Sequence, residues 1–472
     1  MTRKIGSSVQ GLLGITTLLL ICCLGLPSCS SEPSQPDLQA LPDSLDILLV
    51  VDNSGSMVGE QIQLGTNLNH LLSALGHRFQ SDDVHVAVST TGVKSEGCGS
   101  CTANTPFSCV NETGESGVFQ DRYGQFVSIE QDIVEYSSVS RPECKILQSI
   151  DADLCLFNNE SQAGTILVGI NGCGYERGLS AIRLGLSPEL TNSTNQGFLR
   201  PEAQLVVIVV SDEDDCGEVG EITEGIAGVG GRICYYAAKG VGPMGASSSP
   251  DDPDDKPYAL TPLSDYLEHL IALKDGRPGM VKFAAVVGIT DPNDPLATTI
   301  EYMDDSDPRS EILPACITPT CTGRYCHAYP GTRYIGLADL LGLGLDGYVA
   351  SICQADFSTT LRDMGHWLAC PRIFHLTGLM SSPESVEVML DGAVLPRFSC
   401  NLPGSFAELQ ACNGIDDQST CAAGSRCVPT WTYKIQTSNP EFPNGSLIFG
   451  AHADLCELSD ETGLRISLVY PE

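Results

Sequence analysis

Basic residues are scarce in this sequence. It has 25 Lys and Arg side chains against 59 Asp and Glu side chains, so its formal net charge at pH 7 is −34. An acidic surface repels the phosphates of nucleic acids and the anionic faces of membranes. The charge balance therefore argues against nucleic acid as a partner and favours cations or basic partners. Most of the individual acids are expected to serve solubility alone.

The motifs of common catalytic and nucleotide-binding sites are also missing. The chain has no G-x-S-x-G elbow, no H-E-x-x-H pair and no Gly-rich loop that ends in Lys-Ser/Thr. It also shows no internal repeat. Eight His residues, with many Ser and Asp residues, leave a secreted hydrolase as the least favoured alternative. We expect that the protein is not an enzyme.

Residues 1–29 have the pattern of a lipoprotein signal peptide. Arg3 and Lys4 precede an apolar run over about residues 12–26, which is short for a membrane span. The sequence L-P-S-C at 26–29 follows this run and resembles a bacterial lipobox. The resemblance implies a lipid anchor at Cys29 in the cell envelope, with the outer membrane preferred. Ordinary secretion and an uncleaved anchor remain alternatives. The Ser/Pro-rich residues 30–44 are expected to form a flexible tether.

The cysteine count points to disulfides. The sequence has 21 cysteines, and setting aside the 3 at Cys22, Cys23 and Cys29 leaves an even 18. An even, high count behind a signal peptide predicts disulfides in an oxidising compartment. The sequence Cys321-x4-Cys326-His327 offers a zinc alternative, but a fourth ligand at proper spacing is missing.

The stretch D-I-L-L-V-V-D-N-S-G-S-M, residues 46–57, organises the chain. Its apolar run predicts a buried parallel strand over 45–52, and helical periodicity follows over 61–79. Asp52, Ser54 and Ser56 then lie on the turn at the carboxyl end of a strand, where open α/β sheets place ligand sites. A carboxylate and two hydroxyls suit a divalent cation, Mg²⁺ first, or Mn²⁺ or Ca²⁺. Alternatively, the turn only caps a helix and Asp52 is solvated.

This D-x-S-x-S, after I-L-L-V-V and before a helix, resembles the metal-ion-dependent adhesion site of the von Willebrand factor A (VWA) family. D-E-D-D-C after the apolar run 205–210, together with G-C-G-Y-E at 172–176, is similar to a VWA subgroup in predicted lipoproteins of myxobacteria and relatives. The resemblance implies that Ser54 and Ser56 bind the cation directly, and that Asp52 and Asp212 bind it directly or through water. A partner carboxylate would take an open position on the ion.

One position departs from the family pattern. The family has a metal-binding Thr on the loop before the next helix, whereas this chain has Tyr175 or Glu176 there. Glu176 could supply a carboxylate oxygen instead, or it could only favour the helix N-terminus through the helix dipole. The adjacent acids Glu213, Asp214 and Asp215 could hold a second cation or simply be solvated, since adjacent acids repel one another.

The periodicity predicts an α/β fold with a doubly wound, mostly parallel sheet of the VWA or Rossmann-like kind, over residues 45–370. Further strands are predicted at 84–88, 205–210, 282–289 and 348–353. Further helices are predicted at about 179–186, 263–273 and 356–368. Disulfide-rich insertions are predicted at about 92–165, 217–258 and 290–345. Residues 371–472 are predicted to form a small disulfide-linked β module.

Two main hypotheses follow for function. The first is a VWA-type lipoprotein of the cell envelope that binds a protein or another macromolecule through a divalent metal. The second is a metal-independent interaction or scaffold module, which the missing Thr favours. Binding of a divalent ion separates the two, and the fold alone does not identify the partner.

Overall fold

The computed structural model describes two groups of residues. The main group is 42–93 without 55, 77 and 80–82, then 176–217 without 194, 260–304 without 278, 311–319 and 326–369. The second group consists of short strand segments at 127–128, 373–376, 387–390, 393–394, 431–434, 446–449 and 466–469. Cys29, the signal peptide and most of the predicted tether and insertions lie outside the described residues. No helix within these ranges is both long enough and apolar enough to cross a membrane.

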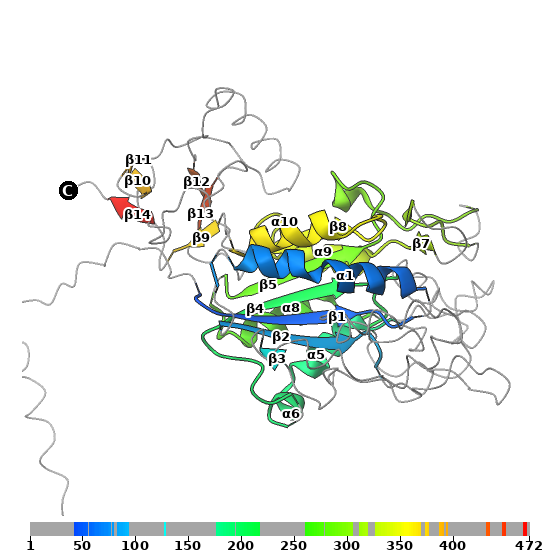
Figure 1. The fold of residues 1–472 in the computed structure, drawn as a ribbon, viewed down its shortest axis with the longest axis horizontal. Helices are drawn as coiled ribbons and strands as arrows, with labels where there is room; N and C mark the ends of the chain where they lie inside the picture. The colour runs from blue at the N-terminus through cyan, green and yellow to red at the C-terminus, as the bar shows by residue number, and fades with distance from the viewer. Residues whose placement is uncertain are drawn as a thin grey trace, which may run out of the picture.

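A six-stranded sheet lies at the centre of the described chain, in the order β3-β2-β1-β4-β5-β8 (Figure 1). Its parallel strands are β1 (Leu45–Val51), β2 (Val84–Thr90), β4 (Gln204–Val210), β5 (Val281–Val287) and β8 (Gly347–Ser351). The short edge strand β3 (Val127–Ser128) pairs antiparallel with β2. Every residue of β1, β4 and β5 is buried, which explains their continuous apolar runs. The predicted doubly wound α/β fold is confirmed.

Helices cover both faces of this sheet (Figure 1). On one face, α1 (Val58–Leu75) and α10 (Ser358–Ala369) pack against β1 side chains such as Ile47 and Leu49. The other face is covered by α5 (Gly178–Gly185), α8 (Leu263–Ala272) and α9 (Thr332–Leu340), around Leu48 and Val50. The short helices α6 (Pro188–Thr191) and η4 (Pro295–Ala297) lie in connecting segments.

Helix α9 lies within residues 290–345, which the sequence analysis assigns to an insertion. Tyr334 and Leu337 on this helix are fully buried and belong to the core on one face of the sheet. This part of the segment is therefore core structure. The preceding hairpin of β6 (Cys316–Ile317) and β7 (His327–Ala328) is antiparallel.

A disulfide joins this hairpin to the segment that follows β8. It links Cys316 to Cys353. Cys326 is also disulfide-bonded, so the predicted disulfides are confirmed at these positions and the zinc alternative for Cys326 is wrong. The cysteines of the other predicted insertions and of the tail lie outside the described residues. Cys216, directly before the second predicted insertion, is disulfide-bonded too.

The described strands after residue 372 form two small antiparallel sheets. One has the order β11-β10-β14 and the other β12-β13-β9. Their strands are β9 (Ile373–His375), β10 (Glu387–Leu390), β11 (Ala393–Val394), β12 (Trp431–Lys434), β13 (Ser446–Phe449) and β14 (Ile466–Val469). The assignment of 371–472 to a separate module stays a prediction.

Candidate metal centre

The carboxyl ends of three neighbouring strands meet at one level of the sheet. In the strand register, Val51 of β1 lies opposite Thr90 of β2 and Val210 of β4. The chain runs from β1 towards one edge of the sheet and from β4 towards the other, so the two strands flank the topological switch point. Open α/β sheets bind ligands at this point. Asp52, which directly follows β1, therefore lies where a ligand site is expected.

The three residues of the D-x-S-x-S turn lie together as predicted. The carboxylate of Asp52 accepts a hydrogen bond from the backbone N–H of Ser54 (2.7 Å) and another from the hydroxyl of Ser211 (2.7 Å). The hydroxyl oxygens of Ser54 and Ser56 are 3.0 Å apart. Asp52 is fully buried, so the alternative in which it is solvated is wrong. Its hydrogen bond to Ser211 ties the turn to the end of β4.

Glu176 is buried beside this turn and points into the protein. One of its carboxylate oxygens accepts a hydrogen bond from the Thr91 hydroxyl, while Oε1 has no hydrogen-bond partner. Burial raises the pKa of Glu176 well above its usual value, and the charge of Asp52 raises it further. Thr91 was not predicted as a site residue. Its position, directly after the strand that neighbours β1, is the sequence signal that could have identified it.

Asp212 completes the predicted set from the end of β4. It is 3% exposed, and its Oδ1 atom has no hydrogen-bond partner. Burial raises its pKa well above the usual value, and the charges of Asp52 and Glu213 raise it further. A hydrogen bond with Ser56 lowers the pKa and partly offsets these effects. The structure thus brings Asp212, on the loop after β4, close enough to interact with Asp52 and Ser56, on the loop after β1.

The four acids of residues 212–215 have different environments. Glu213 is half-buried. Its pKa is raised to about 8, mainly by burial and further by the charge of Asp52. Asp214 accepts hydrogen bonds from the Thr332 hydroxyl (2.5 Å) and the backbone N–H of Arg333 (2.9 Å) at the start of α9. Asp215 accepts one from the backbone N–H of Leu179 (3.0 Å) in α5. Asp214 and Asp215 are therefore buried helix-capping residues, and the alternative in which they are simply solvated is wrong.

Glu60, in the first turn of α1, is an acid of this region that the sequence analysis missed. It is 8% exposed, and its Oε2 atom has no hydrogen-bond partner. Burial raises its pKa to about 7, with a further contribution from the charge of Asp52. The signal in the sequence is weak, because a Glu near a helix N-terminus is favourable through the helix dipole alone.

The residues present fit a hard divalent cation. Glu176 Oε1 and Asp212 Oδ1 are buried carboxyl oxygens without hydrogen-bond partners, and the Ser54 and Ser56 hydroxyls add neutral oxygens. Oxygen ligands of this kind are preferred by Mg²⁺, Mn²⁺ and Ca²⁺. Within the described residues, no group of three or more His, Cys, Asp or Glu side chains is placed to hold an ion. The hydroxyl oxygens would therefore be needed to complete the ligand set.

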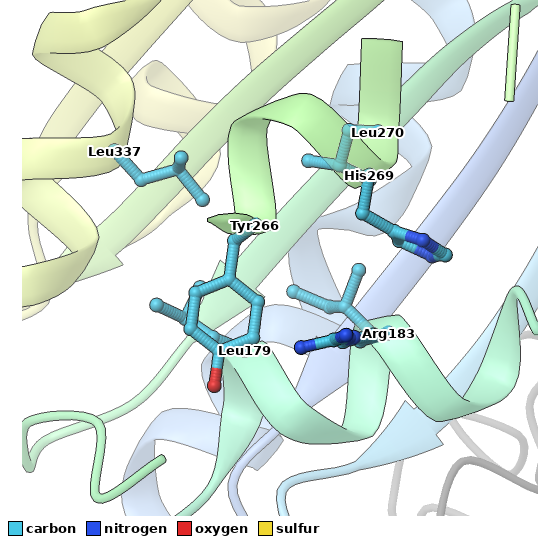
Figure 2. A pocket seen from close by; sticks show the side chains of 7 residues that line it. Leu179, Arg183, Tyr266, His269, Leu270 and Leu337 are labelled. Carbon is cyan, nitrogen blue, oxygen red and sulfur yellow. The ribbon is translucent and has the colours of Figure 1, made fainter. Parts of the chain in front are cut away.

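A small apolar gap lies between α5, α8 and α9, away from this ligand set (Figure 2). Leu179, Leu270 and Leu337 line it, and Arg183 and His269 lie near each other at its side. Burial and the neighbouring Arg183 charge lower the pKa of His269. This lining has no carboxylate, so the gap does not suit a divalent cation.

Comparisons with known proteins give little further information. No family model matches the chain, and no curated protein matches it. Two crystal structures of the pilus adhesin SpaC from Lactobacillus rhamnosus GG match at 13% identity, with TM-scores of 0.30 and 0.28. The matches cover 92% of this chain but only 39% and 40% of the adhesin chains. A likeness this weak does not bear on fold or function.

Proposed function

We propose that this chain is a VWA-type protein that binds a divalent cation, preferably Mg²⁺, and uses it to hold a protein or another macromolecular ligand. The observation that carries the proposal is the pair of buried, unpartnered carboxylate oxygens, Glu176 Oε1 and Asp212 Oδ1. A buried carboxylate oxygen that lacks a hydrogen bond is costly when the group is ionised. A cation between these groups would remove that cost.

The site residues would have different roles. Ser54, Ser56, Glu176 and Asp212 would offer oxygens to the ion. Both oxygens of Asp52 already accept hydrogen bonds, from Ser54 and Ser211, so Asp52 would mainly orient the turn and act on the ion through water. The bound ion would supply a positive charge with open positions for an oxygen of the partner. No step of this scheme requires catalysis.

We also propose that the protein is anchored in the cell envelope through Cys29. The Cys316–Cys353 disulfide supports an oxidising compartment, because disulfides persist mainly in such compartments. The strongly acidic composition supports a cationic or metal-bridged partner over nucleic acid.

A metal-independent interaction module is the second candidate, and one observation favours it. The pKa values of Glu176 and Asp212 are raised well above their usual values. A protonated carboxyl is neutral and needs no cation, so the site could persist without metal. This candidate predicts that divalent ions do not bind at the site.

The test is calorimetric titration of Mg²⁺, Mn²⁺ and Ca²⁺ into the chelator-stripped protein. The parent is compared with Asp52→Ala and with Asp363→Ala, a matched control on α10 whose side chain is 52% exposed. We expect binding in the parent and the control that is lost in Asp52→Ala. Equal weak binding in all three would mean that acidic loops collect cations without a defined site. No binding in any of them would favour the metal-independent module.

A further inference from the structure

The loop after β4 connects the candidate metal site to two helices. Its first acid, Asp212, interacts with Ser56 across the site. Its last two acids turn the other way, since Asp214 binds the first residues of α9 and Asp215 binds the backbone of α5. Because these acids are adjacent in the chain, any shift of α9 or α5 moves the loop that carries Asp212.

Glu176 depends on the same loop. Its backbone carbonyl accepts a hydrogen bond from the N–H of Cys216 (2.6 Å). Three residues further on, the N–H of Leu179 donates to the Asp215 carboxylate (3.0 Å). Both ends of the short connection between Glu176 and α5 are therefore held by residues 215 and 216. Glu176 and Asp212, which carry the two unpartnered carboxyl oxygens of the site, lie on segments that meet at Asp215.

Arg333 joins these segments to α9. Its Nε donates to Asp215 Oδ2 (3.0 Å), its Nη2 donates to the carbonyl of Thr261 (2.7 Å), and its backbone N–H donates to Asp214 Oδ1 (2.9 Å). The side chain is 11% exposed and the Asp215 side chain is fully buried, so solvent screens this ion pair little. The guanidinium satisfies two acceptors at once with a fixed spacing, which a Lys ammonium does not reproduce.

We propose that Arg333 is a positioning residue for the candidate metal site, which it does not touch. It fixes the Glu176 and Asp212 segments relative to each other, and it offsets the charge of Asp215 so that the ion has fewer acids to neutralise. This inference rests on the proposed function, because it assumes that the site binds a cation. Groups that orient metal ligands from outside typically change metal affinity 10–100-fold when they are mutated.

The test compares Mn²⁺ affinity in the full chain, by calorimetry, for the parent, Arg333→Gln and Arg333→Lys. Arg362→Gln is the control, because Arg362 on α10 also makes an ion pair, with Asp363, but its side chain is 53% exposed. Circular dichroism first establishes the temperature below which each variant is fully folded, and affinity is measured there. We expect at least about a 10-fold loss for Arg333→Gln, a smaller loss for Arg333→Lys and none for Arg362→Gln.

The outcomes separate the inference from the proposed function. A merely structural role for Arg333 would lower the melting temperature but leave the affinity of the folded variant unchanged, and that result would overturn the inference alone. If Arg333→Gln does not fold, Arg333→Lys decides, since it keeps the charge but not the paired contacts. A parent that binds no cation would overturn the proposed function, and the inference with it.

Discussion

Without a divalent cation, the folded protein is expected to lose stability as the pH rises from about 5 to about 8. The best-defined contribution comes from Glu60, whose pKa is raised from 4.5 to about 7, mainly by burial. A carboxyl with a raised pKa in the folded state holds its proton more tightly there than in the unfolded chain. Its stabilising effect is fully present below the unfolded pKa and is lost as the pH rises through the folded pKa.

The magnitude follows from the shift. A change of one pKa unit corresponds to about 1.4 kcal/mol, so Glu60 alone should reduce the free energy of unfolding by about 3 kcal/mol across this range. Glu213, with a pKa raised to about 8, changes stability in the same direction and extends the loss to higher pH. The expected slope is therefore steep for a protein whose stability is typically only about 5–15 kcal/mol.

The assay is urea unfolding in the presence of a chelator at a series of pH values, for the parent and for Glu60→Gln. The variant keeps the shape of the side chain but has no titrating proton, so its stability should fall less with pH. Glu268→Gln is the control, because Glu268 is exposed on α8. Saturating Mg²⁺ should reduce or reverse the slope for the parent, because an ion binds the ionised carboxylates of the folded site.

The reasoning would be refuted if the stability of the metal-free parent stayed constant or rose over this pH range. It would also fail if Glu60→Gln kept the full slope of the parent, since the titrating group would then be another residue.

Two further predictions concern buried contacts of residues outside the candidate ligand set. Gly178→Ala should destabilise the protein by about 1–3 kcal/mol, because the added Cβ would clash with the hydroxyl of the buried Tyr334. The loss is measured as a lower melting temperature. Gly59→Ala is the control, because open space surrounds Gly59, and equal effects of the two changes would contradict the prediction. Lys282→Met should cost about 3–5 kcal/mol in urea unfolding, because it removes the ammonium group that lies 2.6 Å from the buried Asp346 carboxylate. A neutral outcome there would show that Asp346 is protonated or rehydrated in the variant.

The strands of the central sheet could be predicted well from the sequence, because burial on both faces leaves a simple signal. The run L-V-V-I-V-V at 205–210 has no polar position, and β4 is observed at Gln204–Val210. Helix α9 was not predicted, although its buried residues Tyr334, Leu337 and Ala338 recur at the three- and four-residue spacing of a helix. The cysteines that precede it in the chain led to its assignment to a disulfide-rich insertion instead.

The candidate site could be predicted where its residues are close in the chain. Asp52, Ser54 and Ser56 share one turn, so their meeting follows from the strand and helix on either side. Thr91 and Glu60 join them only through the order of the strands and the packing of α1, which the sequence does not reveal. The different roles of Asp212 and Asp215 were equally hidden, because the direction of each side chain depends on the helices around the loop.

The position of the candidate ligands has a consequence for how such a protein can diversify. Asp52 and Thr91 directly follow β1 and β2, and Asp212 comes two residues after β4. Every residue of β1 and β4 is buried. Substitutions at the residues that follow the strands would therefore change the chemistry of the site while leaving the buried sheet intact. We expect relatives on this framework to share the strands and to differ at the residues that follow them.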